Sequence, residues 1–353
     1  MCVFRGMPRP LGCAAAIWAC LTFLSGCGER GEEVVVYISA DEYVAREVVR
    51  AFEQESGIRV RFVGDTEAQK TTGLVERLRA ERGNPQADAF WSSEIFLTIA
   101  LADEGILAPY ESPVAIEWPG TFRDRNSYWY GLAARGRVIV YAPDRVPEAH
   151  RPRTWQDLTD ERFRGRIVMA DPRFGTTGGH FAAKKVFWGE EAYNEFLDGL
   201  AANETRLLAS GNAGVVRAVA DGEADVGMTD TDDVWAAQAQ GLNVELIYPD
   251  HAERDERSTG IGTLLIPNTV AIVAGGPNPG NAAAFVDFML AGQAERILAE
   301  TVSGNTPVRP GLAAEYPSSD IPDPLAVDFH EVAAAFEDAV TRAMRILRDG
   351  EGR

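Results

Sequence analysis

Short apolar runs alternate along the chain with stretches in which apolar residues recur every three or four positions. Residues 34–39 (VVVYIS) form a run of strand length, and residues 40–57 follow with their apolar positions on one helix face. Residues 58–62 alternate apolar and basic positions, which is typical of a half-buried strand. Two more elements complete this series: a helix marked by Leu74 and Leu78, and a strand at 87–91 (ADAFW). Alternating strands and helices of these lengths predict βαβ units and a mostly parallel sheet.

A second series follows a loop at 109–130 that is rich in Pro, Asp and aromatic residues. Its strand candidates, separated by helical stretches, are 165–170 (GRIVMA), 224–228 (ADVGM) and 244–248 (VELIY). Two extended segments rich in β-branched residues, 137–141 and 263–273, stand at the boundaries between the series. We expect both to be hinge crossings between two α/β lobes, which is the geometry of a hinged clamp. The predicted domains are a first lobe over 34–130 completed by about 270–310, a second lobe over 131–269, and a C-terminal helical segment over 311–353.

The first residues have the pattern of an export signal. Two arginines precede an apolar run (LGCAAAIWACLTFL) that is too short to span a bilayer. Residues 24–27 (LSGC) resemble the bacterial lipobox, whose cysteine is lipidated and becomes the mature N-terminus. We therefore predict a lipoprotein signal peptide over 1–26, a lipidated Cys27 and a polar tether over 27–33. An ordinary signal peptide cleaved near Gly26 is the alternative. The protein is expected in the periplasm or at the cell surface, held to a membrane through its lipid anchor only.

Composition narrows the possible partners. The length of 353 residues indicates about two domains, and 46% hydrophobic residues exclude a disordered chain. The net charge of −19 argues against nucleic acid or an anionic membrane surface as a partner. All four cysteines lie within the first 27 residues, so the remaining chain has no disulfide, thiolate metal site or cysteine nucleophile.

Common catalytic motifs are missing from the sequence. No serine stands in G-x-S-x-G, and neither a Walker A loop nor G-x-G-x-x-G occurs. His330-Glu331 begins like a zinc-protease motif, but position 334 is alanine. We therefore expect a binding protein and not an enzyme, with an exported enzyme as the alternative from a different class.

Two segments of the second lobe are candidates for an anion site. Thr176, Thr177 and Gly178 open a helical stretch after the strand at 165–170, where free backbone N–H groups and the helix dipole favour an anion. Asn212 precedes the next helical run and could cap that helix or turn its amide toward a ligand. A plain helix start with turn glycines is the alternative for the first segment.

An acidic turn follows the strand at 224–228. Asp230, Thr231, Asp232 and Asp233 stand at the carboxyl end of that strand, where open α/β sheets bind their ligands. Three carboxylates within four residues could hold a hard metal ion or an amine. The alternative is a helix start that carries acids because of its dipole.

The first lobe offers two comparable turns at strand ends. One contains Asp41 and Tyr43, and the other contains Trp91, Ser92, Ser93 and Glu94. A helix cap is the alternative for Asp41, and a core aromatic is the alternative for Trp91.

The ordered series of segments resembles the ferric-iron-binding type of bacterial ABC transporter solute-binding proteins. The likeness includes VVVYISADEYVAREVVRAFEQESGIRV, YWYGLAARGRVIVYAPDRV, GEADVGMTDTDD and NTPVRPG, and it covers nearly all of residues 34–311. It implies a two-lobed periplasmic binding protein type II fold that closes on a ligand and delivers it to a permease. In such iron binders a Ser/Thr-Gly loop holds a synergistic anion, which Thr177 and Gly178 match, and an asparagine matches Asn212.

This sequence departs from the ferric-iron-binding pattern at the metal ligands that the resemblance implies. The first-lobe ligands of these proteins fall on Asp41 or Tyr43 and on Ser93 or Glu94. Their tyrosine pair is replaced here by Thr231, Asp232 and Asp233, so phenolate ligation is lost while the anion half of the site remains.

We therefore predict an extracytoplasmic solute-binding lipoprotein that works as a monomer with an ABC permease and its ATPase. Its expected cargo is iron(III) with a synergistic anion or another small charged solute, and no cofactor is obligatory. A phosphorylated or amine-bearing organic solute is the alternative, and Trp91 could then supply a cation–π face.

Overall fold

The computed structural model describes residues 32–64, 71–250 and 262–350. The predicted signal peptide and Cys27 therefore lie outside the described residues. None of the helices in the described ranges combines the length and apolarity that a membrane crossing requires.

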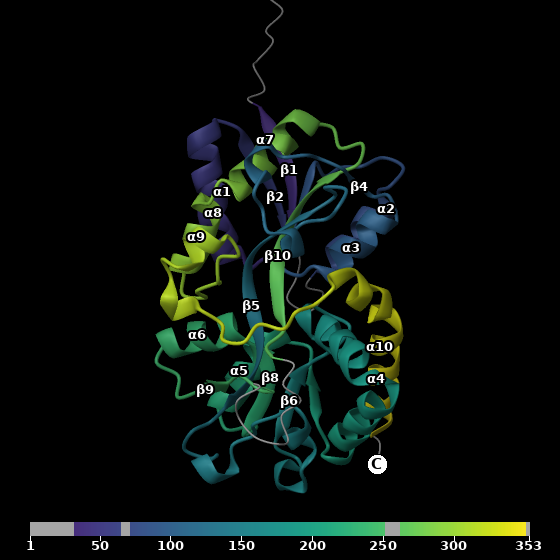
Figure 1. Cartoon of the computed structure of the whole chain (residues 1–353), viewed down its shortest axis with the longest axis vertical. Coiled ribbons are helices and arrows are strands. Elements are labelled where there is room, and N and C mark those ends of the chain that lie inside the picture. The colour runs from purple at the N-terminus through teal and green to yellow at the C-terminus, as the bar shows by residue number, and fades with distance from the viewer. Residues whose placement is uncertain (1–31, 65–70, 251–261, 351–353) are drawn as a thin grey trace, which may run out of the picture. The chain divides into compact units, whose positions relative to one another are not determined.

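The strands join into one mixed sheet. They are β1 (Glu33–Ile38), β2 (Arg59–Gly64), β3 (Ala89–Ser92), β4 (Leu107–Ala108), β5 (Tyr130–Tyr141), β6 (Ile167–Ala170), β7 (Arg206–Leu208), β8 (Val226–Asp230), β9 (Glu245–Ile247) and β10 (Leu265–Val273). Their order is β2-β1-β3-β10-β5-β8-β6-β7, with β4 paired to β10 and β9 paired to β5. β1 pairs in parallel with β2 and β3, and β6 pairs in parallel with β7 and β8. Each parallel group forms the centre of one lobe (Figure 1).

β5 and β10 connect the two parallel groups, as the sequence predicted for two crossings. Residues 130–136 of β5 pair antiparallel with β10, and residues 137–141 pair antiparallel with β8. Ala133 has a positive φ of 41°, and the register of β10 shifts between Pro267 and Asn268. These irregularities lie in the segments that join the lobes, where a hinged clamp must bend.

Helices cover both faces of the sheet. They are α1 (Glu42–Ser56), α2 (Thr72–Ala80), α3 (Phe96–Asp103), α4 (Thr176–Ala202), α5 (Gly211–Ala220), α6 (Thr231–Ala239), α7 (Pro279–Leu290), α8 (Gln293–Glu300), α9 (Pro310–Ala313) and α10 (Phe329–Gly350). Val34, Val36 and Ile38 of β1 enter one apolar core, and Val35 and Tyr37 enter another. β1 is therefore buried on both faces, which explains its continuous apolar run.

α10 touches both lobes from one side (Figure 1). It packs along α4 of the second lobe and against α3 of the first. Phe96 of α3 lies 6.0 Å from Phe329 and 6.3 Å from Phe336, measured between ring centroids. The C-terminal helix thus closes an aromatic cluster at the seam between the lobes.

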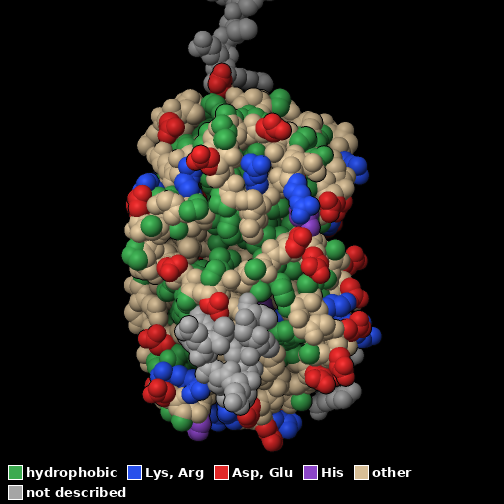
Figure 2. All heavy atoms as spheres, in the orientation of Figure 1, with side chains coloured by type: hydrophobic (Ala, Val, Ile, Leu, Met, Phe, Trp, Pro, Cys, Tyr) green, Lys and Arg blue, Asp and Glu red, His purple; other side chains and the backbone are tan. Residues whose placement is uncertain are grey.

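One face of the molecule carries side chains of both charges. On the face drawn in Figure 2, acidic and basic side chains are scattered over both ends, and hydrophobic side chains are visible between them. The basic groups on this face do not gather into one patch of the kind that binds nucleic acid.

Candidate functional site

A cavity of about 60 Å³ lies between the lobes, and we call it the central cavity. Its polar lining residues are Asp41, Ser93, Arg135, Asp171, Thr176, Asn212, Asp230, Asp232, Asp233, Asn268, Ser303 and Asn305. Many of these follow the carboxyl ends of β1, β3, β6, β7 and β8. This is where open α/β sheets bind their ligands, because loops and helix starts converge there.

Four helices begin at the central cavity, and they differ in charge. α4 and α5 have no acid in their first turn, so their N-terminal N–H groups and dipoles favour an anion. α1 carries Glu42 in its first turn, and α6 carries Asp232 and Asp233. The cavity therefore has an anion-attracting side at α4 and α5 and an acidic side at α6 and α1.

Asp230 is held by a dense set of hydrogen bonds beneath the cavity. Arg137 Nη1 donates to Asp230 Oδ1 at 2.7 Å, and the Thr176 hydroxyl donates to Oδ2 at 2.6 Å. The Asn212 amide donates to Asp230 Oδ2 at 2.7 Å and to the Thr176 hydroxyl at 2.8 Å. Asp230 and Arg137 are each only 1% exposed. The two parts of the second lobe that the sequence singled out, Thr176 and Asn212, thus meet at one buried carboxylate.

Arg135 is the cationic residue of the cavity lining. Its guanidinium donates to the carbonyl oxygen of Ser93 in the first lobe. Its Nε lies 3.6 Å from Asp230 Oδ2 and 3.7 Å from Asp232 Oδ2 in the second lobe. Because it is buried among these partners, Arg135 offsets part of the acidic charge and links the two lobes.

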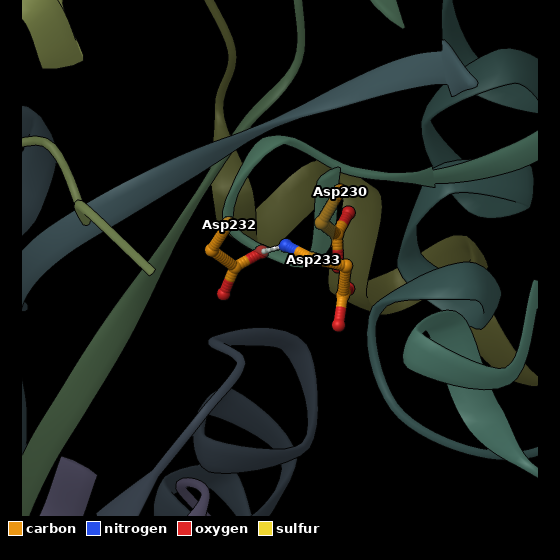
Figure 3. Close-up of side chains that lie close together, drawn as sticks. All are labelled: Asp230, Asp232 and Asp233. Carbon is orange, nitrogen blue, oxygen red and sulfur yellow. Dashed lines mark hydrogen bonds between the residues drawn. The ribbon is translucent and has the colours of Figure 1, made fainter. Parts of the chain in front are cut away.

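The acidic turn forms the compact cluster that the sequence suggested (Figure 3). Carboxylate oxygens of Asp230, Asp232 and Asp233 all lie within 4.8 Å of one another. The backbone N–H of Asp233 donates to Asp232 Oδ1 at 3.1 Å, and Asn305 donates to Asp232 Oδ2 at 3.3 Å. Asp230 stands at the N-cap position of α6, yet its side chain makes no capping hydrogen bond. A capping role therefore does not explain this carboxylate.

Only some of the candidate residues of the first lobe line the central cavity. Asp41 and Ser93 line the central cavity, whereas Tyr43 is 51% exposed and lines a groove that adjoins the cavity at Asp41 and Asp233. Trp91 and Ser92 are fully buried and do not line either space, so neither is placed to touch a ligand. Trp91 belongs to the apolar core beside β1, which agrees with the core alternative for this residue.

The remaining second-lobe candidates lie behind the cavity wall. The Thr177 hydroxyl is fully buried and donates to Asn212 Oδ1 at 3.4 Å. Gly178 is packed closely against the Phe336 ring and the carbonyl oxygen of Pro172. A Cβ at this position would lie 2.6 Å from each, so a side chain has no room here. Thr231 accepts a hydrogen bond from the backbone N–H of Gly136 at 3.1 Å. These residues support the site but do not line it.

Glu94 caps a helix instead of facing the cavity. Its carboxylate accepts the backbone N–H of Phe96 at 2.8 Å and that of Leu97 at 3.1 Å, at the start of α3. The side chain is fully buried, and burial raises the pKa of Glu94 from 4.5 to about 7 because it disfavours the charged form.

Replacing Glu94 with glutamine should change how stability depends on pH. Because the folded-state pKa is raised, the folded chain binds a proton that the unfolded chain lacks, and stability falls as pH rises from about 4.5 to about 7. This group accounts for a loss of about 3 kcal/mol across that window. Urea titrations at both ends of the window should show Glu94→Gln gaining about that much relative to wild type at the higher pH. An identical pH dependence of the two proteins would contradict the placement of this carboxylate.

Sequence reasoning missed the two arginines that organise the site. Arg135 and Arg137 lie two residues apart in β5, every residue of which is buried. Charged residues in a strand that is otherwise apolar are a signal, since a buried charge needs a partner. Asn268, Ser303 and Asn305 were also missed, and they carry no comparable local pattern.

Comparisons with known proteins agree with the two-lobed architecture. The family described as bacterial extracellular solute-binding protein matches residues 47–326. Iron uptake protein A1 of Synechocystis sp. is 24% identical over 310 residues, covering 82% of this chain and 83% of that protein. A putative 2-aminoethylphosphonate-binding periplasmic protein of Salmonella typhimurium is 29% identical over 261 residues, covering 73% of this chain and 72% of that protein.

Solved structures with similar folds cover nearly the whole described chain. Iron-bound HitA from Pseudomonas aeruginosa superposes with a TM-score of 0.78 at 24% identity, covering 89% of this chain and 99% of that one. AfuA from Actinobacillus pleuropneumoniae, with fructose-6-phosphate bound, gives a TM-score of 0.71 at 22% identity, covering 90% of this chain and 97% of that one. The chain belongs to the family of bacterial extracellular solute-binding proteins.

Proposed function

We propose that this protein captures a small charged solute between its lobes outside the cytoplasm and delivers it to the permease of an ABC importer, without chemical turnover. Family membership and the central cavity at the strand ends support this role. The permease and its ATPase are the proposed partners, and the protein is proposed to act as a monomer.

The solute supported best is a small organic molecule that joins an anionic group to an amine or a hydroxyl-bearing part. The observation that carries this is the unequal charge of the helix starts: those of α4 and α5 have no acids, whereas α6 begins with Asp232 and Asp233. Arg135 lies beside Asp230 and Asp232, and Arg137 pairs with Asp230, so the two guanidinium groups offset part of the acidic charge around the cavity. Asp232, Asp233 and Asp41 would receive the cationic part.

Two hydrogen bonds join the lobes in this structure and would stabilise a closed clamp. Arg135 binds the Ser93 carbonyl across the lobes, and the Thr72 hydroxyl donates to the Arg173 carbonyl at 3.1 Å. A solute held by both lobes adds its own contacts to the closed state. It shifts the equilibrium toward closure by its differential affinity for the two states.

Iron(III) with a synergistic anion is the second candidate. The three carboxylates within 4.8 Å of one another favour it, since oxygen ligands suit a hard cation. Two features weigh against it. Both oxygens of Asp230 already accept hydrogen bonds, and Arg135 Nε lies 3.7 Å from Asp232 Oδ2.

A thermal-shift screen of the full chain separates the two candidates. The probes are inorganic phosphate, 2-aminoethylphosphonate and iron(III) citrate. A bound probe at about 100 times its Kd should stabilise the protein by about 2.7 kcal/mol. The proposal expects a shift with the phosphonate and a weaker shift for Thr176→Val, which loses a hydroxyl at the start of α4. A shift with iron(III) citrate alone would favour the metal.

We also propose that a lipid on Cys27 anchors the protein to a membrane, with residues 1–26 removed as a signal peptide. The supporting feature is the LSGC sequence after a short apolar run. Cys27→Ala should release the protein into the soluble extracytoplasmic fraction or stall its processing. Mass spectrometry of the mature N-terminus checks this, and a chain that begins elsewhere without an acyl mass would contradict it.

A further inference from the structure

An outer groove lies next to the central cavity and is much larger. Its volume is about 850 Å³, compared with about 60 Å³ for the central cavity. It is lined by the start of α1 with Asp41 and Tyr43, by α5 with Val216, by α6 with Asp233, and by Val302 after α8. The groove therefore joins α1 of the first lobe to α5 and α6 of the second.

The two spaces share part of their walls. Asp41 and Asp233 line both the central cavity and the outer groove. The central cavity has room for little more than a charged head group. A larger body attached to that head would extend out of the central cavity, and the outer groove adjoins it at Asp41 and Asp233.

The groove wall is suited to an apolar or planar body. Tyr43 and Val302 are 51% and 52% exposed, and both lie in this groove. Alanine side chains and Val216 line the second-lobe side. Exposed large hydrophobic side chains that meet in one groove mark a binding surface more often than isolated ones do.

Both arginines of the groove are already paired. Arg46 forms an ion pair with Glu42, and Arg217 forms one with Asp221 at 2.7 Å. Pairing lowers the cost of placing a neutral body beside these side chains. Because each arginine is already paired with a carboxylate, it attracts a further anion only weakly.

We propose that the outer groove holds the apolar or aromatic body of the solute while its anionic head occupies the central cavity. This inference rests on the proposed function and adds the substrate class: an organic phosphate or phosphonate whose body packs on Tyr43 and Val302. Tyr43 supplies a flat face for that body, and Val302 supplies an aliphatic contact.

Calorimetry on the full chain with inorganic phosphate and phenyl phosphate tests the inference. Phenyl phosphate should bind wild type at least about tenfold more tightly than inorganic phosphate, because its ring leaves water in the groove. Tyr43→Ser and Val302→Ser should each remove most of this difference and leave the affinity for inorganic phosphate unchanged. Ile116→Ser is the matched control, because Ile116 is 80% exposed and lies outside the groove. It should change neither affinity.

Three other results would overturn the inference in different ways. If wild type binds inorganic phosphate and phenyl phosphate equally well, the groove does not contact the solute, although the head-group site in the central cavity still stands. Unchanged affinities in Tyr43→Ser and Val302→Ser, combined with lost solute uptake by cells, would assign the groove to contact with the permease. Binding of neither probe, with a thermal shift from iron(III) citrate, would overturn the proposed organic anion together with the groove.

Discussion

Replacement of Asp230 by alanine is expected to lower the free energy of unfolding by about 3–5 kcal/mol. Asp230 is 1% exposed and neutralises Arg137, which is equally buried, through a contact of 2.7 Å. Without the carboxylate, the Arg137 charge stays buried with no counterion, and Thr176 and Asn212 lose their shared acceptor. Solute affinity should fall as well, since these side chains shape the start of α4 and α5.

Urea unfolding at neutral pH measures this effect. Asp221→Ala is the matched control, because Asp221 also pairs with an arginine, at 2.7 Å, but its side chain is 45% exposed. It should cost about 0–1 kcal/mol. Adding Arg137→Met to Asp230→Ala should recover much of the loss, because the buried charge is then removed. A cost below about 1 kcal/mol for Asp230→Ala would show that the pair is not the support of the site.

Phe96→Ala is expected to cost about 3–5 kcal/mol, the range typical of a buried phenylalanine. Phe96 is 1% exposed, and its ring fits against Gly179 of α4. A Cβ at Gly179 would lie 2.0 Å from Phe96 Cε2, so only glycine leaves room for this ring. The substitution leaves a cavity. It also removes the contacts of the Phe96 ring with Phe329 and Phe336 at the seam between the lobes.

The same unfolding measurement applies here, with Phe62→Ala as the control. Phe62 of β2 is only partly buried, and its ring lies 5.4 Å from the Arg46 guanidinium. The smaller buried area predicts a smaller loss, at most about half of that for Phe96→Ala. If the two variants lose the same free energy, the aromatic cluster between α3, α4 and α10 does not stabilise the seam.

Periodicity predicted the architecture well because both lobes bury parallel strands on two faces. The run at 34–39 became β1, and the run at 165–170 became β6, within one to two residues. β4 and β7 were missed, since strands of two and three residues leave no periodic signal. β5 extends from Tyr130, well before the predicted start at 137, because GLAARG has small and charged residues that do not look like a strand.

The residues that line the central cavity were predictable only where their position next to a predicted strand or helix decided the outcome. Asp41, Ser93, Thr176 and the three carboxylates of the acidic turn follow strands that the sequence predicted, Asn212 precedes a predicted helix, and all of these line one cavity. Side-chain direction was not predictable for their neighbours. Glu94 turns back to cap α3, and Trp91 points into the core, because tertiary packing sets these rotamers. Asn305 reaches Asp232 from a distant part of the chain, which no local pattern could indicate.

The central claim is that one solute places its anion at α4 and α5 and its cationic group on the acidic turn. The most direct test compares 2-aminoethylphosphonate with ethylphosphonate, which lacks the amine, by calorimetry on wild type and Asp232→Asn. Wild type should bind the amine-bearing compound at least about tenfold more tightly, the size expected for one charged hydrogen bond. Asp232→Asn should remove most of that preference and leave ethylphosphonate affinity unchanged. Equal affinities in wild type, or an undiminished preference in Asp232→Asn, would contradict the account.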